Sequence, residues 1–264
     1  AAYFLMSQPG ANLRAEYDAR RLVLKSVPAD APITEQDIGR LPLPVQRYMV
    51  RSGSIGKPPV SSVHVTFDTV LYSDPGSAGM SGPSHQIDII DPPRRLFFME
   101  TKMYGLPVAV LHDYNGDTAT MRVRLARLFD VVNIGGPEMS KGETVTVLND
   151  LALFAPFALI GPRFKWSAVD DTQADVTFTN GAYTVSARLT FNPEGDLVNF
   201  TSNDRGELQK DQSLKLLPWS TPASEFKDYE GRRVPGRGDA VYHRDTGPFT
   251  YGTFKVTNVT FNQP

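Results

Sequence analysis

The chain has 264 residues, and its 27 Lys and Arg against 29 Asp and Glu give a formal net charge of −2. A hydrophobic content of 41% with 21% charged residues is typical of a globular protein and excludes a disordered chain. The balanced charge argues against a nucleic-acid partner, and the absence of cysteine excludes disulfides, thiolate metal sites and cysteine nucleophiles.

Residues 1–6 (AAYFLM) form a short apolar stretch ahead of a Ser-Gln-Pro-Gly sequence. Two interpretations are open. The stretch is the trailing end of a removed signal or membrane anchor, or it packs on the edge of the core. No apolar run in the chain approaches the length of about 18 residues that spans a membrane.

Three helical segments are predicted before residue 58. Apolar residues recur at helical spacing over residues 12–25, with Asn12 as the N-cap. Thr34, followed three residues later by Asp37, has the pattern of a capping box at the start of a second, short helix. Residues 45–51 form the third segment, directly after two prolines.

From residue 60 the hydrophobic period changes to two, which predicts β-strands. Asn115-Gly116 and Asn180-Gly181 each indicate a hairpin turn of type I′, in which both central residues have positive φ. Strands are predicted over residues 63–71, 95–103, 107–114, 119–125, 128–134, 163–169, 174–178, 183–191, 197–202, 226–234, 239–244 and 249–262.

Residues 138–160 interrupt the strands with helical spacing. Ser140 and Glu143 match a capping box, and Pro156 kinks or divides the segment. Its apolar face should cover the concave face of the sheet, because no other segment offers a comparable stripe. The residues expected on that face are Val147, Leu151, Phe154 and Phe157.

The predicted fold class is α+β. We expect a large, curved, mostly antiparallel sheet of ten or more strands, open as a half-barrel, with N-terminal helices and one helical insertion over about residues 138–160. Because hairpin follows hairpin, residues 1–264 are predicted to form a single domain. Residues 1–58 are its mainly helical segment, and residues 59–264 hold the sheet and the insertion.

The sequence contains no catalytic motif, and neither a cofactor nor a metal site is predicted. The four histidines lack metal-ligand spacing, and residues 113–124 lack the glycine and the final glutamate of a calcium loop. Glu143 and Asp150 share a face of the predicted helix, so they can serve acid–base chemistry if their pKa values are split. The interpretation we favour is that Glu143 caps the helix and Asp150 is solvated.

Large apolar side chains gather in the middle of the chain and are the candidates for a binding cavity. Methionine adapts to irregular partners, and Met and aromatic residues on a concave sheet face can enclose a lipid-sized ligand. The alternative is an ordinary core between sheet and helix. The residues predicted to line a ligand cavity are Met103, Met121, Phe154, Phe157 and Trp166.

Four segments together resemble a known protein family. They are residues 41–53 (LPLPVQRYMVRSG), 142–156, the strands after Trp166, and 191–205, which begins FNPEGD. The sequence is similar to an uncharacterised bacterial family, often membrane-anchored at the N-terminus, with an LPxxVQRYL-like motif; Met49 stands where Leu is usual. The resemblance covers about residue 40 to the end and implies no activity. The meander with a helical insertion is also similar to half-barrel lipoprotein carriers of the bacterial envelope.

Three functions stay open on the sequence alone. We favour a non-enzymatic protein that binds a lipid or other apolar ligand in the cell envelope, either periplasmic or anchored to the outer side of a membrane. This function predicts a continuous apolar cavity between sheet and helix. The second is a structural or interaction protein with a solid core. The third is a carboxylate-dependent hydrolase, which predicts that Glu143, Asp150 or Asp204 meets a histidine in a cleft.

Overall fold

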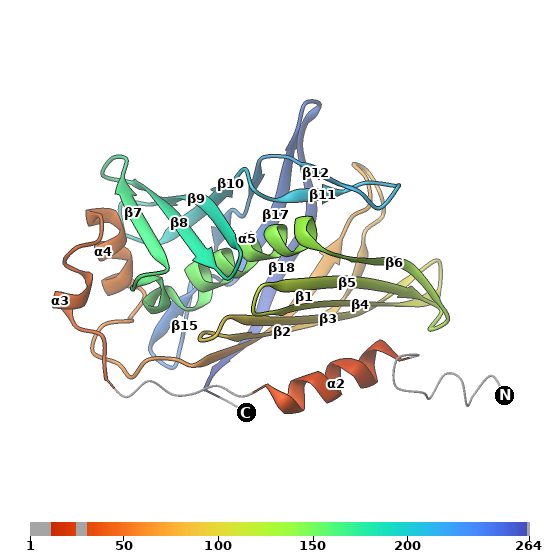
Figure 1. The fold of residues 1–264 in the computed structure, drawn as a ribbon, viewed down its shortest axis with the longest axis horizontal. Coiled ribbons are helices and arrows are strands. Elements are labelled where there is room, and N and C mark those ends of the chain that lie inside the picture. The colour runs from red at the N-terminus through yellow and green to blue at the C-terminus, as the bar shows by residue number, and fades with distance from the viewer. Residues whose placement is uncertain (1–11, 25–30, 263–264) are drawn as a thin grey trace.

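The computed structural model describes residues 12–24 and 31–262, so the apolar stretch of residues 1–6 lies outside the described residues. Figure 1 shows a large open sheet that curves around one long helix, α5 (Pro137–Phe154). The first helix, α2 (Leu13–Val23), lies on the opposite face of the sheet, against β3 and β4. The predicted α+β fold class is therefore confirmed.

Over residues 12–24 and 31–262, the main sheet has 14 strands and is not closed. Its order is β6-β5-β4-β3-β2-β1-β18-β17-β13-β10-β9-β8-β7, with β14 paired to β17, while β11–β12 and β15–β16 form two separate hairpins. The strands are β1 (Ser62–Leu71), β2 (Met80–Ile89), β3 (Arg94–Met103), β4 (Leu106–Asn115), β5 (Thr118–Leu125), β6 (Phe129–Gly135), β7 (Phe164–Ala168), β8 (Gln173–Asn180), β9 (Tyr183–Phe191), β10 (Leu197–Ser202), β11 (Gly206–Leu208), β12 (Leu214–Leu216), β13 (Trp219–Ser220), β14 (Ala223–Ser224), β15 (Lys227–Tyr229), β16 (Arg232–Val234), β17 (Arg237–Arg244) and β18 (Gly247–Phe261).

The helix starts follow the local signals closely. The side chain of Asn12 accepts a hydrogen bond from the backbone N–H of Arg14 at 3.0 Å, so it caps α2 as predicted. Thr34 and Asp37 form the predicted capping box of α3 (Glu35–Ile38). The third helix, α4 (Leu43–Arg51), begins two residues before the predicted start because a proline in the first turn needs no hydrogen-bond donor.

Both predicted hairpins form, but their turns are centred one residue later than predicted. Asn115 pairs with Thr118, so Gly116 and Asp117 are the central residues of the first turn. Of these two, Gly116 alone has a positive φ, at 72°, which a glycine adopts without steric cost. The second turn repeats this arrangement at Gly181 and the residue after it. The type I′ prediction is therefore wrong at both turns.

Strand β2 has no counterpart among the predicted strands, because its Gly-Pro content is typical of a loop. Gly82 makes the strand possible at this place. A Cβ atom at Gly82 would lie 2.1 Å from the backbone oxygen of Glu100 on β3, so only glycine allows this close approach. The predicted strand over residues 226–234 is in fact the hairpin of β15 and β16.

The predicted capping box of the inserted helix is also wrong. Helix α5 begins at Pro137, three residues before Ser140, and the 3-10 helix η1 (Pro156–Leu159) follows it. The Ser140 hydroxyl instead accepts a hydrogen bond from the backbone N–H of Ala119 at 2.9 Å, which ties α5 to β5.

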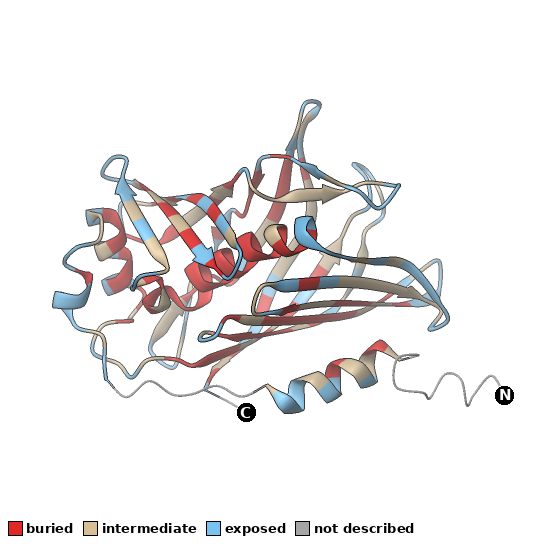
Figure 2. Ribbon diagram, viewed as in Figure 1, coloured by how far each residue is buried: buried red, intermediate tan, exposed pale blue. Residues whose placement is uncertain are grey.

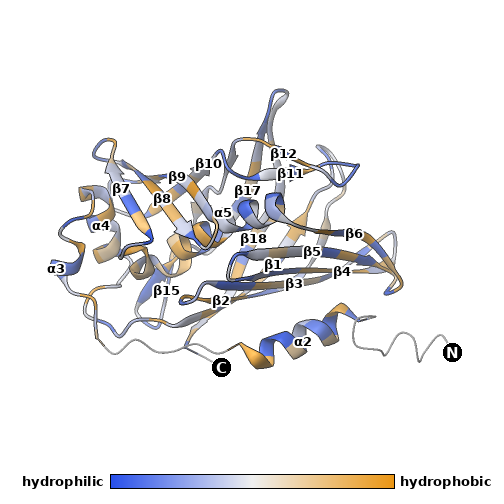
Figure 3. Cartoon of the chain, viewed as in Figure 1, coloured by the Kyte–Doolittle hydropathy of each residue, from blue (hydrophilic) through white to orange (hydrophobic). Residues whose placement is uncertain are grey.

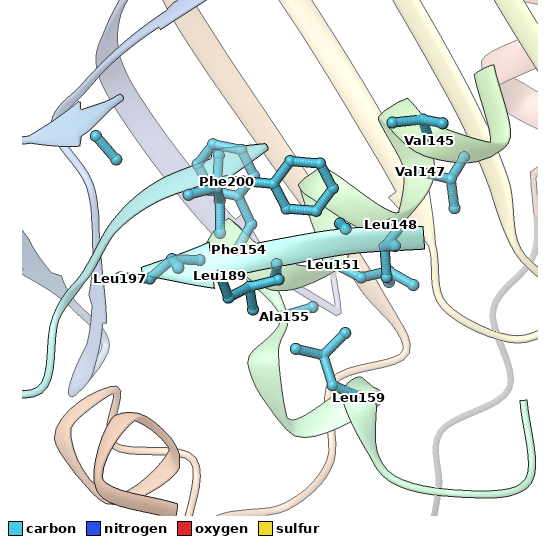
Figure 4. Packing of buried hydrophobic residues seen from close by; sticks show 14 of the residues in the cluster. Val145, Val147, Leu148, Leu151, Phe154, Ala155, Leu159, Leu189, Leu197 and Phe200 are labelled. Atoms are coloured by element: carbon cyan, nitrogen blue, oxygen red, sulfur yellow. The ribbon is translucent and has the colours of Figure 1, made fainter. Parts of the chain in front are cut away.

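Helix α5 is buried along almost its whole length (Figure 2). Leu148, Leu151, Leu189 and Phe200 are buried in one core cluster, in which α5 packs against β9 and β10 (Figure 4). The four apolar residues expected on the buried face of the insertion, Val147, Leu151, Phe154 and Phe157, all belong to this core cluster.

Helix α2 covers the outer face of the sheet. Tyr17 is buried there and stacks on Phe98 of β3 with 5.0 Å between ring centroids.

Because Asn12 holds the first turn of this helix, we expect Asn12→Ala to lower the free energy of unfolding by about 1 kcal/mol in urea titrations. Asn12→Asp keeps the capping oxygen and should match the parent protein. Equal stability of Asn12→Ala and Asn12→Asp would contradict the capping role.

Candidate functional site

A cavity of about 420 Å³ lies between α5 and the inner face of the sheet. Its wall takes residues from β1 to β5 on one side, from α5 on the other, and from β17, β18 and the β11–β12 hairpin. Most of the wall is apolar. A volume of this size lies within the range of small-molecule binding sites.

The cavity wall contains two of the five residues predicted to line a ligand site, Met121 and Phe154. Phe157 is buried in the core cluster outside the wall, and Trp166 packs against that cluster while its indole N–H donates to the Leu159 carbonyl at 3.1 Å. Met103 is half-buried at the end of β3, away from the wall.

Phe67, Phe97 and Phe254 are among the further aromatic residues that line the cavity. Phe67 on β1 and Phe97 on β3 each meet Phe254 of β18 edge to face, with ring centroids 5.7 and 6.4 Å apart. Phe67 also meets Phe154 at 6.1 Å. Alternation along β1 places Phe67 on the buried face, and that signal was available in the sequence, whereas Phe97 lies in a continuous apolar run that does not show which face it is on.

A polar stripe on α5 faces this apolar wall. It consists of Glu143, Thr146, Asn149 and Asp150, whose spacing of three and four residues puts them on one side of the helix. Figure 3 shows the hydrophilic N-terminal half of α5 giving way to a hydrophobic C-terminal end. The N-terminal half of α5 therefore brings polar groups into an otherwise mostly apolar cavity.

Arg95 of β3 holds the two carboxylates of this stripe. Its Nε lies 2.7 Å from Asp150 Oδ2 and its Nη1 lies 3.3 Å from Glu143 Oε2, while its Nη2 donates to Gln86 Oε1 at 3.0 Å. Gln86 in turn donates to Asp88 at 2.7 Å. The shared face of Glu143 and Asp150 is thus confirmed, but the capping and solvated roles favoured for them are wrong.

A second arginine reaches Glu143 from the other direction. Arg205 Nη1 lies 3.1 Å from Glu143 Oε1 and donates to the Gly142 carbonyl at 3.2 Å and to Thr146. The guanidinium of Arg205 also lies over the Trp219 ring, 4.8 Å from its centroid. Asp204, the neighbouring residue, pairs with Lys141 at 2.8 Å and does not enter the cavity wall.

The environment splits the pKa values of these groups. Burial opposes ionisation of Glu143, but Arg205 and Arg95 outweigh it and hold the pKa of this carboxyl well below its usual range. Burial raises the pKa of Asp150 against the pull of Arg95, and burial with the nearby Asp150 raises the pKa of Asp88 well above its usual value. Among these carboxyls, Glu143 is therefore the one that stays ionised to the lowest pH.

His112 of β4 stands beside this cluster. Its Nδ1 lies 3.7 Å from Glu143 Oε1, which is too long for a hydrogen bond, and the atom has no other partner among the described residues. Burial lowers the pKa of His112, so the ring is neutral at neutral pH. A carboxylate and a histidine thus meet in the cavity, although the part of the chain that the structure describes has no group of three residues able to hold a metal ion.

The open antiparallel sheet, the helix inside its curve and the cavity between them define a half-barrel with an internal cavity. The chain belongs to a family of unknown function, DUF6544, whose model matches residues 31–254. This confirms the family resemblance predicted from the motifs. No match was found among curated proteins.

The chain is similar to solved structures of about its own length. A domain described as an outer membrane lipoprotein-sorting protein of Vibrio parahaemolyticus is 12% identical with a TM-score of 0.42. The superposition covers 83% of this chain and 91% of that chain. A LolA-superfamily protein of Nitrosomonas europaea is 11% identical (TM-score 0.46, coverage 83% and 94%). A DUF1329 protein of Desulfovibrio piger is 11% identical (TM-score 0.43, coverage 84% and 94%).

Among the described residues, no helix is both long and apolar enough to cross a membrane.

Proposed function

We propose that this protein binds a lipid or other apolar small molecule in the cavity between α5 and the sheet, without a chemical step, in the bacterial cell envelope. The observation that supports binding is the cavity itself, which has about 420 Å³ of space and a mostly apolar wall. The envelope location rests on the family resemblance of the sequence.

The cavity also argues against a solid structural core. Protein interiors are packed at the density of organic crystals and contain few voids larger than one water molecule. The space of about 420 Å³ lined by Phe67, Phe97 and Met121 is far larger than such a void and is partly open to solvent, so a ligand can enter it. Apolar space of this kind is filled at a gain in free energy by an apolar ligand.

Fluorescence of the neutral apolar dye N-phenylnaphthylamine tests the proposal. Val123 lines the cavity on β5. In the variant Val123→Trp the bulky indole ring should fill the space and weaken dye binding at least about tenfold. Val169→Trp is the matched control, because Val169 is exposed and lies outside the wall. Native mass spectrometry of the purified protein should also detect a bound lipid. Absent dye binding, or equal binding by both variants, would overturn the proposal.

A carboxylate-dependent hydrolase is the second candidate function. The observation that favours it is the approach of His112 to the ionised Glu143 inside the cavity. In this function the neutral imidazole acts as general base, and the negative charge of Glu143 stabilises the imidazolium that forms. Hydrolysis of nitrophenyl esters that His112→Gln abolishes would support the hydrolase, whereas equal rates for parent and variant would exclude it.

A further inference from the structure

The charged side chains of the cavity wall are paired with one another. The wall holds four arginines and four carboxylates, and each arginine lies 2.5–3.6 Å from a carboxylate of the same wall. The pairs are Arg95 with Asp150, Arg205 with Glu143, Arg244 with Glu207, and Arg237 with Asp239. The wall therefore has no surplus charge to receive an ionised group, and burial of an unpaired ion costs much free energy.

The hydroxyl of Tyr251 in this wall has a hydrogen to donate and is held in place by its neighbours. Tyr251 of β18 accepts hydrogen bonds from Trp219 Nε1 at 3.1 Å and from Arg205 Nη2 at 3.5 Å. Indole and guanidinium groups are donors only, so the Tyr251 oxygen is the acceptor in both bonds. Within residues 12–24 and 31–262, no acceptor receives the hydroxyl hydrogen of Tyr251 in return.

The hydroxyl of the neighbouring Tyr242, unlike that of Tyr251, already donates its hydrogen within the protein. Tyr242 of β17 stacks on Tyr251 with 4.8 Å between ring centroids, and its hydroxyl donates to the Gly206 carbonyl at 2.8 Å. Both rings line the cavity, but the hydroxyl hydrogen of Tyr242 is already used. The stacked pair and the two donors hold the Tyr251 ring in place, so its hydroxyl is a fixed donor in a mostly apolar wall.

We infer that the ligand is an uncharged lipid with an oxygen acceptor, such as an ester, ketone or hydroxyl oxygen, which accepts a hydrogen bond from Tyr251. The inference rests on the proposed function and adds the chemical class of the ligand. The paired wall excludes an ionised head group from the cavity, and the apolar wall holds the hydrocarbon part. The oxygen acceptor fixes the orientation of the ligand because Tyr251 is at one place in that wall.

Displacement of N-phenylnaphthylamine by two ligands of equal chain length tests this inference. At about pH 8, where laurate is ionised, methyl laurate should displace the dye at a concentration at least about tenfold lower than laurate requires. Tyr251→Phe should weaken methyl laurate about threefold to tenfold more than it weakens the dye, since the dye has no oxygen acceptor. Tyr242→Phe should keep the preference of the parent protein for methyl laurate.

Equal or tighter binding of laurate by the parent protein would overturn the inference while dye binding upholds the proposed function. The inference is also overturned if Tyr251→Phe has an unchanged circular-dichroism spectrum and binds methyl laurate as tightly as the parent protein does. The comparison of the two ligands on the parent protein decides the charge preference even if Tyr251→Phe fails to fold. Failure of the parent protein to bind the dye is a separate result and overturns the proposed function itself.

Discussion

Replacement of Arg95 by methionine is expected to lower the free energy of unfolding by about 3–5 kcal/mol, measured by urea denaturation at neutral pH. The side chain of Arg95 is only 10% exposed, and it is the one arginine that the structure places within reach of Asp150 among the described residues. Its removal leaves the Asp150 carboxylate buried without a counter-ion, and Glu143 keeps Arg205 alone.

The double variant Arg95→Met with Asp150→Asn separates charge from packing. It removes one positive and one negative charge, and Glu143 still pairs with Arg205 at 3.1 Å. More than half of the lost stability should therefore return, because neutral groups cost less to bury than an unpaired ion. Arg188→Met is the surface control: Arg188 pairs with Asp175 at 2.8 Å, but both side chains are more than 40% exposed, so stability should hardly change. A double variant no more stable than Arg95→Met would show that lost packing, and not unpaired charge, causes the effect.

The Arg95 cluster explains why part of the site escaped sequence analysis. Arg95 and Glu143 are 48 residues apart, and Glu143 and Arg205 are 62 residues apart. Only the fold brings them together, whereas Ser140 and Glu143 match a capping box by spacing alone. One signal was available: Arg95 stands directly before the apolar run Leu-Phe-Phe-Met, and a charged residue in a buried strand needs a partner.

The regular part of the sheet was predictable for the opposite reason. Strand β9 alternates apolar and polar residues without error, and one face of it is buried, so its period of two reports the fold directly. Strand β2 failed because Gly82 and Pro83 are loop residues by local preference, and the close approach of β3 that favours Gly82 is a long-range contact. Local signals thus predicted the regular strands, whereas the long-range contacts at Gly82 and Arg95 lay beyond them.

Phe154→Ala tests whether the cavity is open space or part of the packed core. The Phe154 side chain is 6% exposed and packs edge to face on Phe67, and it also forms part of the cavity wall. Truncation should lower the free energy of unfolding by about 3 kcal/mol, the low end for a buried aromatic ring, because one side of this ring already borders empty space. The lost ring contact should also weaken N-phenylnaphthylamine binding about twofold to tenfold.

Leu148→Ala on the same helix is the matched control. Leu148 is fully buried on the side of α5 that packs against β9 and lies outside the cavity wall (Figure 4). Its truncation should cost about 2–5 kcal/mol and leave dye binding unchanged. If Phe154→Ala behaves like Leu148→Ala, with a large loss of stability and unaltered dye binding, then Phe154 is purely a core residue. The dye site would then lie elsewhere, and the solid-core interpretation would replace the binding cavity.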